Sequence, residues 1–123
     1  MAAPLIIQGE DRNINITIID SESNVAIDLT NINSIAGSDI TLQLPNTLGG
    51  KVEFKKSASE ISIVSATQGK IQVTMTDIKT ADIKTGTIDG QLILDFGAPT
   101  GGERRIIKIA KMFLVEAKYT WSI

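Results

Sequence analysis

The residue types most often used for catalysis are scarce in this sequence. Its 123 residues include no cysteine and no histidine, which excludes thiolate nucleophiles, disulfides, sulfur-ligated metals and Ser–His or Cys–His pairs. Carboxylate and lysine chemistry remains formally possible. The densest cluster of carboxylates and lysines consists of Asp77, Asp82, Lys79 and Lys84. Charges grouped in this way usually form a solvated turn. The sequence therefore predicts no catalytic residue, no cofactor and no enzymatic activity.

Two further segments share features with ligand-binding loops. Asp20, Glu22 and Asn24 place side-chain oxygens at alternate positions, as calcium loops do. The segment lacks the glycine and the distal glutamate of an EF-hand, so we interpret it as a polar hairpin turn that binds no metal. Residues 101–105 are glycine-rich like a phosphate loop, but no Lys-Ser or Lys-Thr pair follows them. We interpret this segment as a hairpin turn before a strand that begins with basic residues.

The overall charge disfavours nucleic acid as a partner. The formal net charge is −2 and the sequence pI is about 5.0, whereas binding to phosphates needs a basic surface. No apolar run approaches the ~18 residues of a membrane span. The short apolar start, Leu5-Ile6-Ile7, has no basic region before it, so it does not resemble a signal peptide. We therefore expect neither nucleic acid nor membrane as a partner.

Apolar and polar residues alternate along most of the chain. Alternation with a period of two places the apolar side chains on one face of a strand, and several of these segments are rich in Ile, Val and Thr, which favour strands. Turn signals separate the segments by roughly 8–12 residues, as in sandwiches and barrels. We therefore predict an all-β fold, an antiparallel immunoglobulin-like β-sandwich, with a partly closed barrel as the alternative. The predicted core positions are Ile14, Ile16, Ile18, Ile40, Leu42, Leu44, Val52, Phe54, Ile61, Ile63, Ile71, Val73, Met75, Leu92, Leu94 and Phe96.

One stretch interrupts the alternation. Residues 76–86 begin with residues that cap helices and end on Gly86. Ile78 and Ile83 are five residues apart, a spacing that does not suit a long amphipathic helix. We predict a short helical crossover between two sheets over residues 77–84. The chain has the length of one domain, and we divide it into an N-terminal arm or edge strand (1–12), a β-sandwich (13–117) and a C-terminal tail (118–123).

The segment from Arg104 to Ala117 is apolar on both faces of the strand that it predicts. A strand that covers a sandwich needs one buried face, so the second face should meet something else. Two interpretations are open: the strand bends at a β-bulge around Ala110 and stays within its own core, or its second face contacts another subunit. One face carries Ile106, Ala110, Met112 and Leu114, and the other carries Ile107, Ile109, Phe113 and Val115.

The two ends of the chain add further apolar residues. Residues 2–7 are apolar, contain a proline and precede a polar stretch, a pattern typical of an edge strand or of an arm that docks on a neighbour. The C-terminal tail holds the only Tyr and the only Trp, two residue types favoured at interfaces. The candidate interface residues are therefore Leu5, Ile6, Ile7, Ile107, Ile109, Met112, Phe113, Leu114, Val115, Tyr119 and Trp121.

The order of these features along the chain is itself informative. An apolar start ends in Gly plus acid, and an alternating strand with a polar turn follows it. The step at Val25-Ala26-Ile27-Asp28-Leu29-Thr30 comes next. These three features lie at residues 6–11, 13–24 and 25–30. Further strands, turns and the short helical segment follow at 40–45, 69–76, 77–86, 90–97 and 104–115. In this order, over most of the chain, they resemble the N-terminal immunoglobulin-like domain of phage baseplate upper proteins and related tail-fibre attachment proteins, whose members have a similar proline/valine-x-aspartate-leucine step.

The resemblance implies a virion structural protein without catalytic residues. Family members usually continue into a linker and further fibre or receptor-binding domains, whereas this chain ends eight residues after Val115, so we expect an adaptor or attachment subunit. We expect a homo-oligomer of the tail, baseplate or tail fibre that binds other virion structural proteins, made in the host cytoplasm and carried in the virion. The alternatives are a capsid decoration or head-associated subunit and a host-surface carbohydrate-binding module, which the aromatic content of 4% disfavours.

Overall fold

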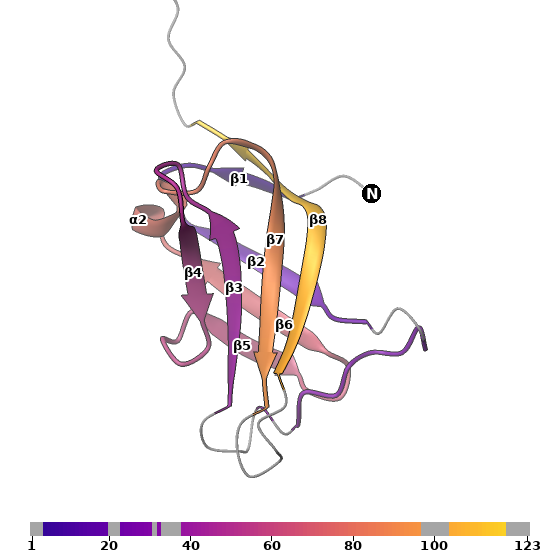
Figure 1. Ribbon diagram of the computed structural model, residues 1–123. Helices are drawn as coiled ribbons and strands as arrows, with labels where there is room; N and C mark the ends of the chain where they lie inside the picture. The colour runs from indigo at the N-terminus through magenta and orange to yellow at the C-terminus, as the bar shows by residue number, and fades with distance from the viewer. Residues whose placement is uncertain (1–3, 20–22, 31, 33–37, 97–103, 118–123) are drawn as a thin grey trace, which may run out of the picture.

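The computed structural model describes residues 4–19, 23–30, 32, 38–96 and 104–117, and most of them lie in β-strands (Figure 1). The all-β fold predicted from the alternation is therefore confirmed. No helix among the described residues is long and apolar enough to cross a membrane. The strands are β1 (Leu5–Ile7), β2 (Arg12–Thr17), β3 (Asp39–Pro45), β4 (Lys51–Lys55), β5 (Ile61–Ser65), β6 (Lys70–Met75), β7 (Gly86–Asp95) and β8 (Arg104–Glu116), and one helical turn, α2 (Asp77–Thr80), lies between β6 and β7.

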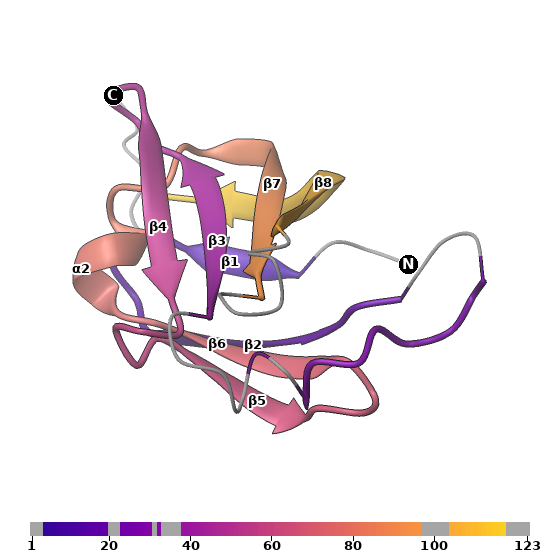
Figure 2. The same ribbon diagram turned by 60° about the horizontal axis from the view of Figure 1, so that its bottom comes forward.

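The strands form two sheets that lie over each other as separate layers (Figure 2). One sheet has three strands in the order β2-β6-β5, and the other has five in the order β1-β8-β7-β3-β4. Neighbouring strands are antiparallel, with the exception of β1, which runs parallel to β8. This sandwich-like arrangement explains the alternation in the sequence, because each strand buries one face against the opposite sheet.

The core lies between the two sheets, and the alternating residues face it. All but two of the sixteen predicted core side chains are buried. The exceptions are Ile16 on β2 and Ile63 on β5, which are partly buried and pack against the core. Both lie on edge strands of the three-stranded sheet, although Ile14 and Ile61 on the same two strands are buried.

The predicted helical crossover is shorter than expected. The helix α2 covers Asp77–Thr80, and Ile83 then forms an isolated antiparallel bridge with Asn46. The segment does cross from the three-stranded sheet to the five-stranded sheet, since it links β6 to β7. Ile83 is fully buried whereas Ile78 is exposed, so a single turn followed by a bridge accounts for the five-residue spacing better than a continuous helix would.

The charged cluster on this crossover differs in part from the predicted solvated turn. Asp77, Asp82 and Lys84 are exposed, as expected. The half-buried Lys79 instead forms an ion pair with Glu60 (Nζ–Oε2 2.5 Å), donates a hydrogen bond from Nζ to the carbonyl of Glu53 (2.6 Å) and lies over the ring of Phe54. These contacts tie the crossover to β4 and to the turn before β5, which gives Lys79 a structural role.

The polar segment after β2 returns along the turn between β5 and β6. The N–H of Ile18 donates to the carbonyl of Gly69 (2.9 Å), and the N–H of Ile27 donates to the carbonyl of Ile18 (3.0 Å). Gly69 has φ +63°, and a Cβ built there would lie 2.6 Å from the carbonyl oxygen of Ile18. Glycine is therefore required at this position for both conformation and space. Asn24 also has a positive φ, while Asp20 and Glu22, the other residues of the predicted hairpin turn, lie outside the described residues.

The N-terminal segment belongs to the five-stranded sheet. β1 pairs along the end of β8, with Leu5 opposite Leu114, Ile6 opposite Val115 and Ile7 opposite Glu116. Ile6 is fully buried in the common core. Of the two predictions for this segment, an arm or an edge strand, the structure shows the edge strand. The predicted tail at 118–123 and most of the predicted turn at 101–105 lie outside the described residues.

Candidate interaction surface

The long strand β8 contains a β-bulge at the place where the sequence allowed one. Its pairing with β7 runs from Arg104 opposite Asp95 to Ile109 opposite Gly90, and it resumes at Phe113 opposite Ile88. Residues 110–112 of β8 thus lie opposite a single residue of β7, Asp89. The interpretation that β8 bends at a bulge around Ala110 is confirmed. The bulge adds two residues to β8, so odd-numbered side chains face the core on both sides of it.

Three side chains define the bulge. Lys111 has φ +50°, a left-handed conformation that is strained for a residue with a Cβ. Its N–H donates a hydrogen bond of 2.8 Å to the carboxylate of Asp89. Met112 turns inward over Gly90, where a Cβ would collide with the methionine sulfur. Gly90 therefore leaves the space that Met112 fills, and the bulge brings a residue of the even-numbered face into the core.

The bulge and β1 together place four of the predicted interface residues in the core of this domain. Ile6, Met112, Phe113 and Val115 are all buried. The prediction that they offer a surface to another subunit is therefore wrong for the folded domain. The physical reason is that β1 and β7 flank the end of β8, so the inner face of this end is fully covered.

The other predicted interface residues lie at or near the surface. Ile107 and Ile109 are partly buried and pack against the core, and Ile7 is half-buried. Leu5 and Leu114 are exposed by 39% and 36% and lie side by side on the outer face of the sheet. Tyr119 and Trp121 lie outside the described residues.

One surface residue was not among the candidates. Ile106 is 54% exposed and lies on the outer face, opposite Ile93 of β7, which is buried on that same face. Ile93 interrupts the polar side of the alternation on β7, with Gln91 and Asp95 on either side. Two features of the sequence could have identified this pair. Ile93 is an apolar residue at a polar position of β7, and Ile106 belongs to a strand that is apolar on both faces.

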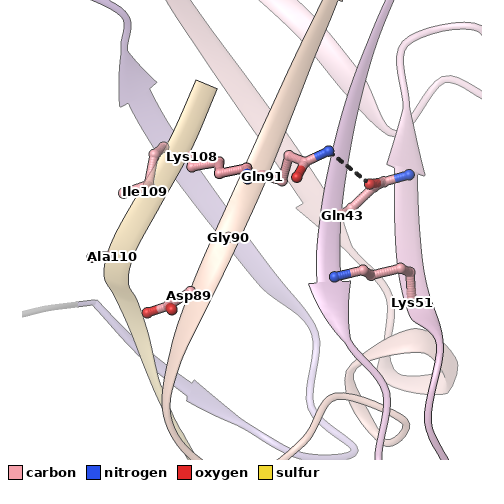
Figure 3. A pocket seen from close by; sticks show the side chains of 8 residues that line it. All are labelled: Gln43, Lys51, Asp89, Gly90, Gln91, Lys108, Ile109 and Ala110. Atoms are coloured by element: carbon pink, nitrogen blue, oxygen red, sulfur yellow. Dashed lines mark hydrogen bonds between the residues drawn. The ribbon is translucent and has the colours of Figure 1, made fainter. Parts of the chain in front are cut away.

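The outer face of the five-stranded sheet is otherwise polar. Gln91 donates to the side-chain oxygen of Gln43 (3.3 Å; Figure 3). Gln43 in turn donates to the carboxylate of Glu53 (2.7 Å), so that a row of hydrogen-bonded side chains crosses β7, β3 and β4. Lys108 continues this row on β8, directly opposite Gln91. These side chains lie beside a shallow depression of about 230 Å³ lined by Gln43, Lys51, Asp89, Gly90, Gln91, Lys108, Ile109 and Ala110.

The depression is small and mixed in charge. Its volume is below the roughly 300–1,000 Å³ of typical small-molecule sites. Lys51 and Lys108 contribute positive charge to it, and Asp89 is already bound to the backbone of Lys111. Among the described residues, no three Asp or Glu side chains lie close enough together to hold a metal ion. This depression is therefore smaller than a typical small-molecule site.

The step at 25–30 that contributed to the family resemblance forms a local turn. The carboxylate of Asp28 accepts hydrogen bonds from the hydroxyl (2.5 Å) and from the N–H (2.9 Å) of Thr30, and these bonds lower the pKa of Asp28. Leu29, the residue between Asp28 and Thr30, is buried, and its N–H donates to the carbonyl of Ala66 (2.8 Å). The aspartate-leucine pair therefore shapes a turn and anchors it to the core.

Comparison with known proteins adds no family assignment to this geometry. No protein-family model matches the sequence, and no curated protein matches it.

Proposed function

We propose that this domain is a structural adaptor, a subunit that works by joining other proteins in a larger assembly. Following the family resemblance, the assembly is a phage tail, baseplate or tail-fibre attachment site, and the chain forms a homo-oligomer there. The proposal rests on the fold and on the distribution of exposed apolar side chains.

We also propose that the two-layer fold is immunoglobulin-like. When the strands are lettered in chain order, with β4 as C′, the two sheets become B-E-D and A-G-F-C-C′. Immunoglobulin domains place B, E and D in one sheet and C, F and G in the other, and variable-type domains add C′ to the latter. The departure is β1, which pairs with β8 and not with β2. No strand of one sheet pairs with a strand of the other among the described residues, which favours a sandwich over the partly closed barrel.

The observation that carries the adaptor proposal is the presence of exposed aliphatic residues on the outer face of β1 and β8. Leu5, Ile106 and Leu114 all lie on the outer face of the same sheet, on its edge strand and the neighbouring strand. Single exposed apolar residues are ordinary, but here Leu5 and Leu114 are adjacent in register. Apolar residues of this kind release water when another protein covers them, which stabilises association.

Substitution of these residues tests the adaptor proposal. The variants Leu5→Lys, Ile106→Lys and Leu114→Lys should remain folded, because all three side chains are exposed. Each should weaken association, since a lysine must lose its water when the face is covered. Sedimentation velocity measures this for the purified chain alone and mixed with structural proteins encoded beside it, and circular dichroism checks the fold.

Val64→Lys is the matched control. Val64 is 62% exposed and lies on β5, in the other sheet. This variant should assemble like the unmodified chain. Association that survives all three substitutions on β1 and β8 would contradict the proposal, as would a chain that remains monomeric with every candidate partner.

A further inference from the structure

The edge of β8 before the bulge has no neighbouring strand in the described part of the chain. β7 pairs with β8 on one side over its length, whereas β1 pairs on the other side with Leu114, Val115 and Glu116 alone. Figure 1 shows β1 crossing near one end of β8 and the rest of β8 forming the border of its sheet. Residues 106–109, which lie in regular strand before the bulge, thus present one side of their backbone for pairing with a further strand. At about 3.3 Å per residue, this open stretch is roughly 13 Å long.

The side chains along this edge are incompletely covered on the inner face. Ile107 and Ile109 point toward the core and pack against it, but both remain partly exposed. By contrast, Phe113 and Val115 on the same face are almost completely buried where β1 is present. An additional strand beside residues 106–109 would cover Ile107 and Ile109 in the same way as β1 covers the end of β8.

The charge on β8 indicates what kind of strand would fit. The strand carries four basic residues, Arg104, Arg105, Lys108 and Lys111, and its one acidic residue is Glu116 at the far end. This is a local excess of positive charge in a chain with a net charge of −2. Opposite charges on paired strands stabilise the pair, and like charges destabilise it.

The same charges disfavour a second copy of β8 as the added strand. Antiparallel pairing of two such edges centred on Lys108 would place Lys108 of one copy opposite Lys108 of the other. An acidic segment from a different protein meets no such repulsion.

We propose that residues 106–109 of β8 bind an extended, acidic segment of a partner protein, which adds to the five-stranded sheet as a further strand. The segment has aliphatic side chains on the face that covers Ile107 and Ile109, and a carboxylate beside Lys108 on the outer face. Backbone hydrogen bonds supply affinity, and the alternating side chains supply specificity. This inference rests on the proposed adaptor function, for which it names the chemistry of one partner segment.

A short synthetic peptide that alternates Val and Glu is the probe. Fluorescence anisotropy should show that it binds the unmodified chain, and amide hydrogen exchange should slow within residues 106–109. An otherwise identical peptide with N-methylated amides should not bind, because it cannot pair with the strand edge. A peptide that alternates Val and Lys should bind about tenfold more weakly or worse.

Charge reversal on the protein completes the test. Lys108→Glu should weaken binding of the Val-Glu peptide by about tenfold and should favour the Val-Lys peptide instead. The control is Lys55→Glu, since Lys55 is an exposed lysine on β4 at the opposite edge of the same sheet. This variant should bind the Val-Glu peptide as the unmodified chain does.

Three results would overturn the inference. The first is that the Val-Glu peptide fails to bind or protects amides elsewhere. The second is that the N-methylated peptide binds equally well, which would mean charge attraction without strand pairing. The third is that the unmodified chain does not bind the peptide and the Lys108→Glu variant self-associates. This result would mean that Lys108 prevents pairing between the edges of two copies. If Lys108→Glu nevertheless assembles normally with the partner proteins, the adaptor function stands and this strand-addition mode fails.

Discussion

The two halves of β8 both have an apolar inner face, but they have different surroundings. After the bulge, β8 lies between β7 and β1, and Phe113 and Val115 are almost completely buried. Before the bulge, β8 has β7 on one side alone, and Ile107 and Ile109 are only partly buried. The apolar pattern is the same on both sides. The fuller burial of Phe113 and Val115 therefore coincides with the part of β8 that has β1 beside it.

The largest difference between the halves should appear in large-to-small substitutions. Phe113→Ala should lower the free energy of unfolding by about 3–5 kcal/mol, because it leaves a cavity in a closed part of the core. Ile107→Ala should lower it by only about 1–2 kcal/mol, since the partly exposed side chain has less transfer free energy to lose. Urea denaturation measures both. Equal losses would show that the two halves are equally buried in solution.

The bulge that separates the halves should show coupling between Gly90 and Met112. Gly90→Ala places a Cβ against the methionine sulfur, and we expect a loss of about 1–3 kcal/mol from overpacking. The loss should be much smaller in a Met112→Ala background, because the shorter side chain leaves room for the added methyl group. A double-mutant cycle in urea measures the interaction. Strictly additive losses would mean that Met112 does not lie over Gly90.

The smallest expected change in the free energy of unfolding comes from a glycine substitution in the bulge. The sign of this change shows whether the backbone there is strained. Lys111 has a positive φ, so Lys111→Gly removes conformational strain and should leave the free energy of unfolding unchanged or raise it by up to about 1 kcal/mol. Lys108→Gly, in the regular strand before the bulge, is the control and should lower it by about 0.5–1 kcal/mol. If both glycines destabilise the chain equally, Lys111 is in ordinary strand conformation.

The sequence alone was sufficient for the strands and for most of the core. Alternation identifies which residues share a face, and it grouped Ile107, Ile109, Phe113 and Val115 correctly. It could not show that this face is the inner one, because a strand apolar on both faces gives the same pattern either way. It also could not place Met112 in the core, since its burial depends on a bulge opposite one residue of another strand.

The sequence also could not show which strands would pair, or how completely each apolar side chain would be buried. Ile16 belongs to the same alternating run and the same edge strand as Ile14, but it is less buried, which the alternation does not show. The burial of Ile6 likewise follows from parallel pairing with a strand at the other end of the described chain. Such pairing carries no local signal, because it is determined by which distant segments meet in the folded sheet.

The pairing of β1 with β8 also affects the order in which the sheet can be completed. During synthesis β1 emerges first and β8 last among the strands, whereas antiparallel neighbours such as β5 and β6 emerge together. Contacts between distant segments form slowly, because a long loop must be closed before they stabilise the chain. Ile6 therefore stays without its neighbour Val115 until nearly all of the described chain has been made. The strand whose edge is proposed to bind a partner is the last to appear, so a partly synthesised chain cannot enter the assembly by this route.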